Sequence, residues 1–199
     1  MKKVMLLIML TGWWPKANAQ MQAGVGQYVY MSGKQALTLV SVVYCQTRKN
    51  WYMEGRYNYE ALKTISLYAG KTFEKKSKLS YSVTPLIGAV IGRFNGGSAG
   101  ANSELDYKRL FFSSQCQYTF STQDRTEDFF YSWSDLSYQV VNNIYSGISI
   151  QQTNLYKVKY KLEKGFFLKG IISKWTLPLY VFNPVSRERY YVLGITYDW

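Results

Sequence analysis

Two glutamates, Glu54 and Glu60, are the residues of this 199-residue chain that come nearest to an acid–base pair, and they flank Arg56. Paired carboxylates can divide the roles of general acid and general base when they lie close together. In an extended strand, residues six apart are separated by about 20 Å, which is too far for one catalytic site. We therefore interpret both glutamates as ion-pair partners of Arg56 or Arg109 in a polar network.

Other catalytic chemistry has little support in the sequence. The chain has no His, which removes the most common general base and metal ligand. Cys45 and Cys116 fit no metal-ligand spacing, and we expect them to be packing residues, although an exported chain could form a disulfide. The glycine-rich run 95–102 lacks the Lys-Ser/Thr of a phosphate loop. We expect no enzymatic activity, no metal and no cofactor.

The N-terminal segment, residues 1–19, has the three parts of a secretory signal peptide. Lys2 and Lys3 precede the apolar run Val4 to Leu10, and Ala17-Asn18-Ala19 matches a cleavage site. The apolar run is too short for a membrane-spanning helix. The sequence thus predicts export and a mature chain of residues 20–199, forming one domain.

Alternation of apolar and polar residues dominates the mature chain. In Asn50 to Ala61, one face carries Trp51, Met53, Gly55, Tyr57, Tyr59 and Ala61, and the other carries Asn50, Tyr52, Glu54, Arg56, Asn58 and Glu60. In Leu105 to Ser121, small polar residues occupy one face. A water-filled barrel lumen tolerates such a face, whereas the core of a soluble sheet does not. The predicted lumen network is Tyr52, Glu54, Arg56, Glu60, Arg109, Gln115 and Gln117.

These alternating runs predict an all-β fold, an antiparallel up-and-down transmembrane β-barrel of ten strands, with eight strands as the alternative. The expected strands are residues 21–31, 35–46, 50–61, 64–74, 78–94, 105–121, 128–141, 144–156, 165–181 and 187–199. The glycine-rich run 95–102 is expected to be a loop outside the cell. Pro85 and Pro178 fall inside two runs and predict a bulge or a weakened ladder position there.

The final ten residues end on an aromatic side chain. Tyr191, Leu193, Ile195, Tyr197 and Trp199 share one face of the last predicted strand. A lipid-facing strand of this kind resembles the signal recognised by the outer-membrane barrel assembly machinery. Tyr197 and Trp199 would also be stable at the head-group level of a membrane. We therefore expect an outer-membrane location.

The formal net charge of +12 falls to +9 in the mature chain, because removal of Lys2, Lys3 and Lys16 leaves 21 bases against 12 acids. The bases are scattered, and no basic helix is predicted. This pattern favours contact with anionic lipid head groups over nucleic-acid binding.

The runs NWYMEGRYNYEALKTISLYAGKTF, GGSAGANSELDYKRLFFSSQCQYTFS, FFYSWSDLSY and LYVFNP resemble an uncharacterised group of small outer-membrane proteins of Bacteroidota-type bacteria. The resemblance covers residues from about Asn50 to Trp199. It implies a barrel in the outer membrane and brings no catalytic residues.

Three functions fit the sequence. The favoured hypothesis is a non-catalytic barrel, filled by its own side chains, that serves envelope structure or binds an unknown partner through its outer loops. The second is a narrow channel for small solutes. The third is a soluble periplasmic barrel that binds an apolar ligand as lipocalins do, with its apolar faces pointing inward.

Overall fold

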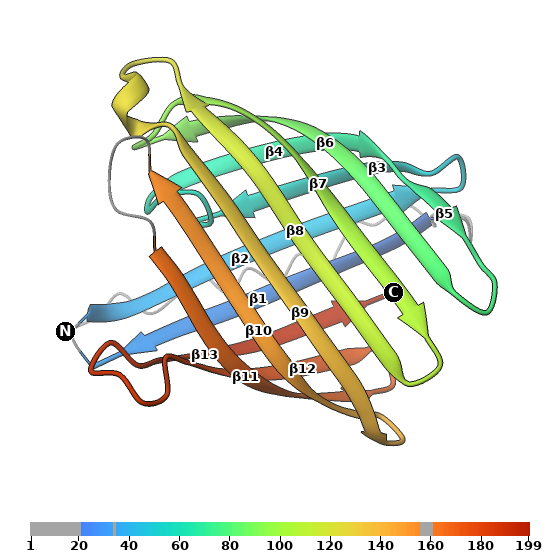
Figure 1. Ribbon diagram of the computed structural model, residues 1–199. Helices are drawn as coiled ribbons and strands as arrows, with labels where there is room; N and C mark the ends of the chain where they lie inside the picture. The colour runs from blue at the N-terminus through green and yellow to red at the C-terminus, as the bar shows by residue number, and fades with distance from the viewer. Residues whose placement is uncertain (1–20, 34, 156–160) are drawn as a thin grey trace, which may run out of the picture.

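The computed structural model describes residues 21–33, 35–155 and 161–199, which form a closed antiparallel β-barrel (Figure 1). The predicted signal peptide lies outside the described residues. The strands are β1 Met21–Ser32, β2 Gln35–Thr47, β3 Trp51–Tyr57, β4 Thr64–Lys71, β5 Phe73–Lys75, β6 Ser80–Gly92, β7 Gly96–Tyr107, β8 Leu110–Ser121, β9 Phe129–Val141, β10 Ile144–Leu155, β11 Lys161–Ile172, β12 Trp175–Phe182 and β13 Tyr190–Asp198. A short 3-10 helix, η1, spans Arg125–Glu127. Among the described residues no helix is long and apolar enough to cross a membrane.

The barrel has twelve strands, because β5 continues β4 in the same register. Gly70 of β4 pairs with Leu86 of β6, and Phe73 of β5 pairs with Val83 of β6. The chain therefore advances by the same number of residues on both strands between the two pairs. Pro85 lies at the break between these two ladders and has no N–H to donate. Each strand otherwise pairs with its neighbour in sequence, and β1 pairs with β13 to close the barrel. The up-and-down topology is confirmed, and the predicted count of ten strands is wrong.

One of the two missing strands was hidden inside a single predicted strand. The predicted strand 165–181 is two strands, β11 and β12, joined by a tight turn in which Ser173 has a φ of 56°. Pro178 interrupts the β12–β13 ladder without shifting it. The register is the same on both sides of the gap, at Thr176–Thr196 and at Leu179–Leu193. The predicted weakening at this proline is therefore a gap of two pairs, at Leu177 and Pro178, and not a bulge.

The glycine-rich run belongs to β7 and is not an outer loop. Its glycines let neighbouring backbone approach closely, because a Cβ at Gly100 would lie 2.4 Å from the carbonyl oxygen of Cys116 on β8. Residues 96–107 pair along their whole length with β6 and β8. The prediction that this run is a loop outside the cell is therefore wrong.

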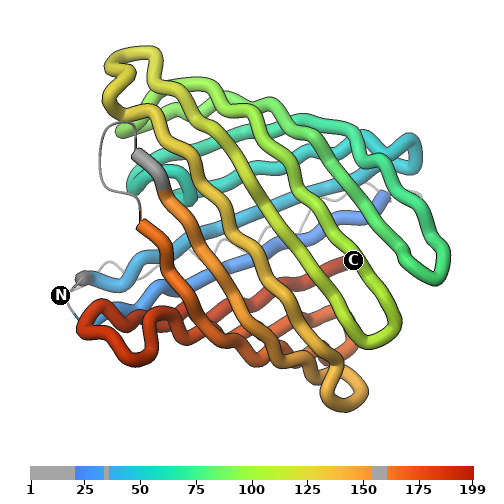
Figure 2. Tube along the Cα trace, viewed as in Figure 1, coloured from blue at the N-terminus to red at the C-terminus, as the bar shows by residue number. Residues whose placement is uncertain are grey.

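The two ends of the barrel differ in the length of their connections. At one end, which we call the turn end, residues 48–50, 76–79, 108–109, 142–143 and 173–174 join the strands, and β1 begins and β13 ends there. At the other, the loop end, residues 58–63, 122–128 and 183–189 form longer links (Figure 2).

In the loop that carries η1, Asp124 accepts a hydrogen bond from the N–H of Thr126, 2.8 Å away, and hydrogen bonding to Thr126 lowers the pKa of this carboxyl.

The outward faces of the strands are apolar, as the alternation predicts. Ile87 and Leu37 leave 71% and 70% of their surface exposed, and Leu67 and Ile91 are similarly open. Buried polar residues such as Ser66, Thr84 and Thr119 face the lumen on the same or neighbouring strands. This is the reverse of a lipocalin-like barrel, so the third hypothesis is wrong.

The C-terminal strand presents the predicted aromatic face to the outside. Tyr191, Leu193, Ile195 and Trp199 are exposed, and the ring of Tyr197 packs against those of Trp175 and Trp199 at centroid distances of 4.7 and 5.9 Å. The N–H of Trp199 donates to the carbonyl of Ala23 on β1, 2.9 Å away. The face is therefore as expected, and its recognition by the assembly machinery stays a prediction.

Candidate functional site

Arg56 on β3 is the centre of the predicted lumen network and is almost fully buried. Its Nε donates to Glu54 Oε1 at 2.5 Å, and its NH1 donates to Glu60 Oε1 at 3.0 Å and to Gln117 Oε1 at 2.6 Å. The guanidinium also lies over the rings of Tyr59 and Tyr68, 4.5 and 4.1 Å from their centroids. A buried charge is tolerated only when it is paired in this manner.

Glu60 reaches Arg56 because β3 ends at Tyr57, earlier than the alternation predicts. Asn58 and Lys63 both take a φ of 58°, and the side chain of Asn58 closes the link by accepting from the N–H of Lys63 at 2.7 Å. The 58–63 link thereby places Glu60 in the lumen, where it accepts hydrogen bonds from Ser66 and Tyr68. The expected separation of about 20 Å between Glu54 and Glu60 is therefore wrong, since both contact one guanidinium.

The other predicted network residues have different outcomes. Tyr52 donates from its hydroxyl to Glu54 Oε2 at 2.7 Å, and Gln115 accepts from the hydroxyl of Tyr59. Arg109, by contrast, is exposed in the turn between β7 and β8 and does not face the lumen. Its inclusion in the network is wrong, because Leu105 to Ser121 is a hairpin and not one continuous strand.

A second polar centre, Asp135 on β9, is absent from the sequence prediction. Its carboxylate accepts from Trp133 Nε1 at 2.9 Å, from the Ser149 hydroxyl at 2.5 Å and from the Tyr180 hydroxyl at 2.9 Å. These donors come from β9, β10 and β12, so residues far apart in sequence complete the site. The alternation of Tyr131, Trp133 and Asp135 with smaller residues was the one signal in the sequence that could have placed Asp135 on the lumen face.

Aromatic side chains surround Asp135 and form the main apolar cluster of the lumen. The cluster consists of Phe167, Tyr180, Phe182 and Val192, with Tyr28, Tyr30, Trp133 and Tyr190 packed against it. Trp133 meets Tyr180 edge to face at a centroid distance of 5.1 Å. We call this region the aromatic wall. Its residues come from β1, β9, β11, β12 and β13, whereas Arg56 lies on β3.

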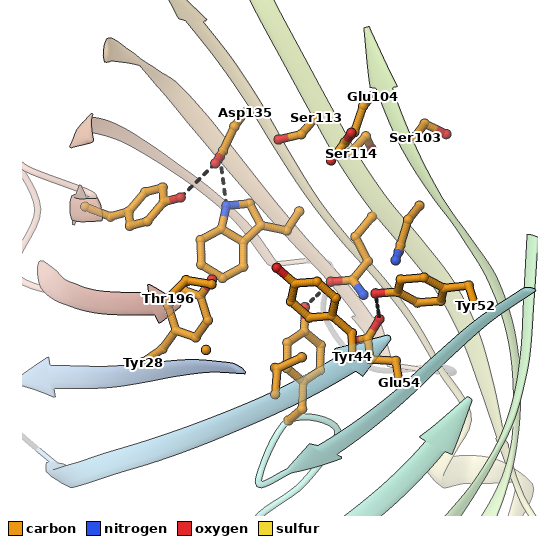
Figure 3. A pocket seen from close by; sticks show the side chains of 17 residues that line it. Tyr28, Tyr44, Tyr52, Glu54, Ser103, Glu104, Ser113, Ser114, Asp135 and Thr196 are labelled. Atoms are coloured by element: carbon orange, nitrogen blue, oxygen red, sulfur yellow. Dashed lines mark hydrogen bonds between the residues drawn. The ribbon is translucent and has the colours of Figure 1, made fainter. Parts of the chain in front are cut away.

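Between these regions lies a cavity of about 300 Å³, which we call the central cavity. Figure 3 shows Glu104 and Asp135 on one side of it and Tyr28, Tyr44, Tyr52 and Glu54 on the other. Its described lining residues are Gly26, Tyr28, Val42, Tyr44, Tyr52, Glu54, Tyr59, Asn102, Ser103, Glu104, Ser113, Ser114, Gln115, Trp133, Asp135, Tyr180 and Thr196. Of this set, Tyr52, Glu54 and Gln115 are predicted from the sequence as lumen residues.

Further cavities extend from the centre toward both ends. One of about 340 Å³ lies at the turn end beside Gln46 and Asn50, and one of about 420 Å³ lies toward the loop end beside Tyr30 and Tyr190. A cavity of about 220 Å³ shares Tyr59 with the central cavity. The lumen thus holds a series of polar spaces separated by side chains, with Tyr59 at one division.

Metal and thiol chemistry find no support in the part of the chain that the structure describes. No three His, Cys, Asp or Glu side chains there are grouped so as to hold a metal ion. Cys45 and Cys116 are free, and they lie on the apolar faces of β2 and β8.

Comparisons with known proteins leave the family open and settle the fold. No family model matches the chain, and no curated protein matches it. Membership in the Bacteroidota-type group therefore stays a prediction. Among solved structures, the KdgM porin in complex with disordered oligogalacturonate has a TM-score of 0.67 at 13% identity, covering 87% of this chain and 98% of the porin. The NanC porin has a TM-score of 0.59 at 10% identity, covering 88% and 98%.

This chain has the barrel fold of outer-membrane porins. A porin with a longer chain, OpdK from Pseudomonas aeruginosa solved with vanillate, also matches, with a TM-score of 0.52 at 7% identity. It covers 92% of this chain, and the match spans 67% of OpdK. At such identities the likeness concerns the fold alone, so the solute has to be inferred from this chain's own lumen.

Proposed function

We propose that this protein is a non-catalytic outer-membrane channel for small water-soluble solutes. The observation that carries the proposal is the series of polar cavities inside a twelve-stranded barrel. In barrels of about eight strands the side chains fill the interior, and each added strand widens it. The hypothesis of a filled barrel depends on a count of eight to ten strands. With twelve strands the interior is wider, so the hypothesis loses that support.

The outward surface supports a membrane location for this channel. On the described strands the outward faces carry no Asp or Glu, and their bases, Lys71, Lys75 and Lys164, lie near strand ends. Lysine side chains at those levels can extend to the head groups. Outer-membrane barrels place short turns in the periplasm and longer loops outside, so we assign the turn end to the periplasm.

The porin neighbours support the same function. KdgM was solved with oligogalacturonate and OpdK with vanillate, so this fold accommodates solutes from single aromatic acids to sugar chains. Tyr59, Arg56 and Glu60 narrow the lumen of the present chain, which favours solutes no larger than a small sugar.

Liposome swelling provides the test. Residues 20–199 would be refolded into liposomes and diluted into isotonic solutions of uncharged sugars of increasing size. Fast swelling with the smallest sugars and slower swelling with larger ones is the expected result. Swelling no faster than in protein-free liposomes, from protein shown to be inserted by its altered gel mobility before heating, would overturn the channel. It would restore the filled barrel that binds a partner through its loops.

A further inference from the structure

The acidic residues of this basic protein are concentrated in its lumen. Glu54, Glu104, Asp135, Glu163 and Asp198 all lie on inward faces, and the 58–63 link adds Glu60. Of the bases on the described strands, Arg56, Lys161 and Lys169 share those faces. The charge of the lumen is therefore opposite in sign to that of the whole chain, +12.

Arg56 and Lys161 already form ion pairs with lumen carboxylates. Arg56 bonds both Glu54 and Glu60, and Lys161 lies 2.7 Å from Glu163. The carboxylates of Asp135 and Asp198 are held instead by neutral donors, the latter by the hydroxyl of Tyr44. Within the described part of the chain, no base lies within 4.0 Å of either, and Lys169, the remaining lumen base, acts on Asp135 and Glu104 only from a longer distance.

The central cavity has the strongest bias. Glu54, Glu104 and Asp135 line it, and none of its described lining residues is Lys or Arg. The side-chain carbonyl oxygen of Asn102, on the same wall, is buried and accepts no hydrogen bond within the described residues. An unsatisfied acceptor of this kind needs a donor or a cation. The cavity thus combines three carboxylates with an unfilled acceptor.

Aromatic rings complete a surface suited to positive charge. Tyr28, Tyr44, Tyr59, Trp133 and Tyr180 line the same cavity, and aromatic faces attract cations. The protein's own cations already occupy such positions. The guanidinium of Arg56 lies over two tyrosine rings, and the ammonium of Lys169 lies 4.9 Å from the ring centroid of Phe111 and 5.0 Å from that of Tyr145.

The bases at the turn end do not cancel this bias. Arg48 and Lys76 border the turn-end cavity, but the side chain of Lys76 is 82% exposed. Exposed charges are screened beyond about 8 Å at physiological ionic strength. Charges in a narrow, low-dielectric lumen are screened much less and raise the local concentration of counter-ions.

From this charge arrangement, we propose that the channel selects small cations, including organic ammonium ions, over anions, with the central cavity as the selecting region. The proposal rests on the channel function above and names its solute class. The positive charge of the solute would lie between the carboxylates of Glu104 and Asp135 and the tyrosine rings, with a donor of the solute reaching Asn102.

The test is the reversal potential of refolded residues 20–199 in a planar bilayer with a KCl gradient. We expect potassium to be more permeant than chloride by about threefold or more. The double variant E104Q/D135N should reduce this ratio at least about twofold. The control E127Q neutralises an exposed acid of η1 and should leave the ratio unchanged. Choline in place of potassium should still carry current.

Three outcomes distinguish a failure of the cation selectivity from a failure of the channel function. Current that favours chloride, or a ratio that the double variant leaves unchanged, would overturn the cation selectivity and leave the channel standing. No current from inserted protein would overturn both. Should E104Q/D135N fail to fold, the single variant N102L tests the same cavity, because it removes the unfilled acceptor and is expected to reduce the choline current.

Discussion

The two sides of the lumen hold their carboxylates in different ways. On the β3 side, Glu54 and Glu60 share the guanidinium of Arg56, so a cation of the protein offsets part of their charge. On the aromatic wall, Asp135 forms no ion pair among the described residues, and its carboxyl group is held by Trp133 and other neutral donors. The first arrangement is suited to closing and stiffening the lumen. The second leaves charge available to a passing solute.

The largest expected effect is the loss of unfolding free energy when Arg56 is substituted. Arg56→Leu removes the shared cation and leaves Glu54 and Glu60 buried without a partner, which should cost about 3–5 kcal/mol of unfolding free energy. Urea titration of the barrel in detergent measures the cost. The triple variant R56L/E54Q/E60Q should recover most of the loss, because it removes the unpaired charges as well. An unchanged midpoint for Arg56→Leu would contradict the account of this side.

Tyr59 offers a sharper test of which side narrows the path. Its ring borders both the central cavity and the cavity beside Gln117, and it meets Tyr131 edge to face at 5.8 Å. Tyr59→Ala should join the two spaces and raise single-channel conductance about twofold, in line with the dependence of barrel passage on interior width. Tyr57→Ala, on the outward face of β3, is the matched control. Equal conductance for both variants would place the narrowing elsewhere.

At Asp135 the expected stability effect is smaller than at Arg56. Asp135→Asn keeps the shape of the side chain but brings an amide N–H₂ toward groups that themselves donate. The loss of one charge-assisted hydrogen bond should cost about 1.5 kcal/mol. Thermal unfolding in detergent measures it. A loss as large as that of Arg56→Leu would mean that the two sides do not differ as described.

The smallest effect is expected at Arg109. This residue is exposed in the β7–β8 turn, and exposed sites without specific contacts tolerate substitution within about 0.5 kcal/mol. Arg109→Ala should therefore leave the urea midpoint unchanged, in contrast to Arg56→Leu. A substantial loss would return Arg109 to the network that the alternation first suggested.

The comparison also shows what could be predicted from sequence. Alternation within β3 correctly placed Tyr52, Glu54 and Arg56 on one lumen face, because side chains on a strand have a period of two. Local pattern also oriented the last strand, where Tyr191 and Leu193 face outward.

Strand ends and strand partners were beyond the reach of the pattern. The alternation of Asn50 to Ala61 continues past Tyr57, and nothing in it signals the left-handed residues Asn58 and Lys63 that redirect Glu60. The strand β7 was missed because glycine has low strand propensity, whereas the close approach of β8 favours it there. The Asp135 centre depends on the register between β9, β10 and β12, which single-strand patterns do not contain.

Single-channel recording from refolded residues 20–199 in a planar bilayer tests the central claim most directly. An open, subdivided lumen predicts steady current steps of uniform size that persist over many insertions. Protein that is demonstrably inserted and yet passes no current at any applied voltage would contradict it, and would show that the β3 side and the aromatic wall together close the barrel.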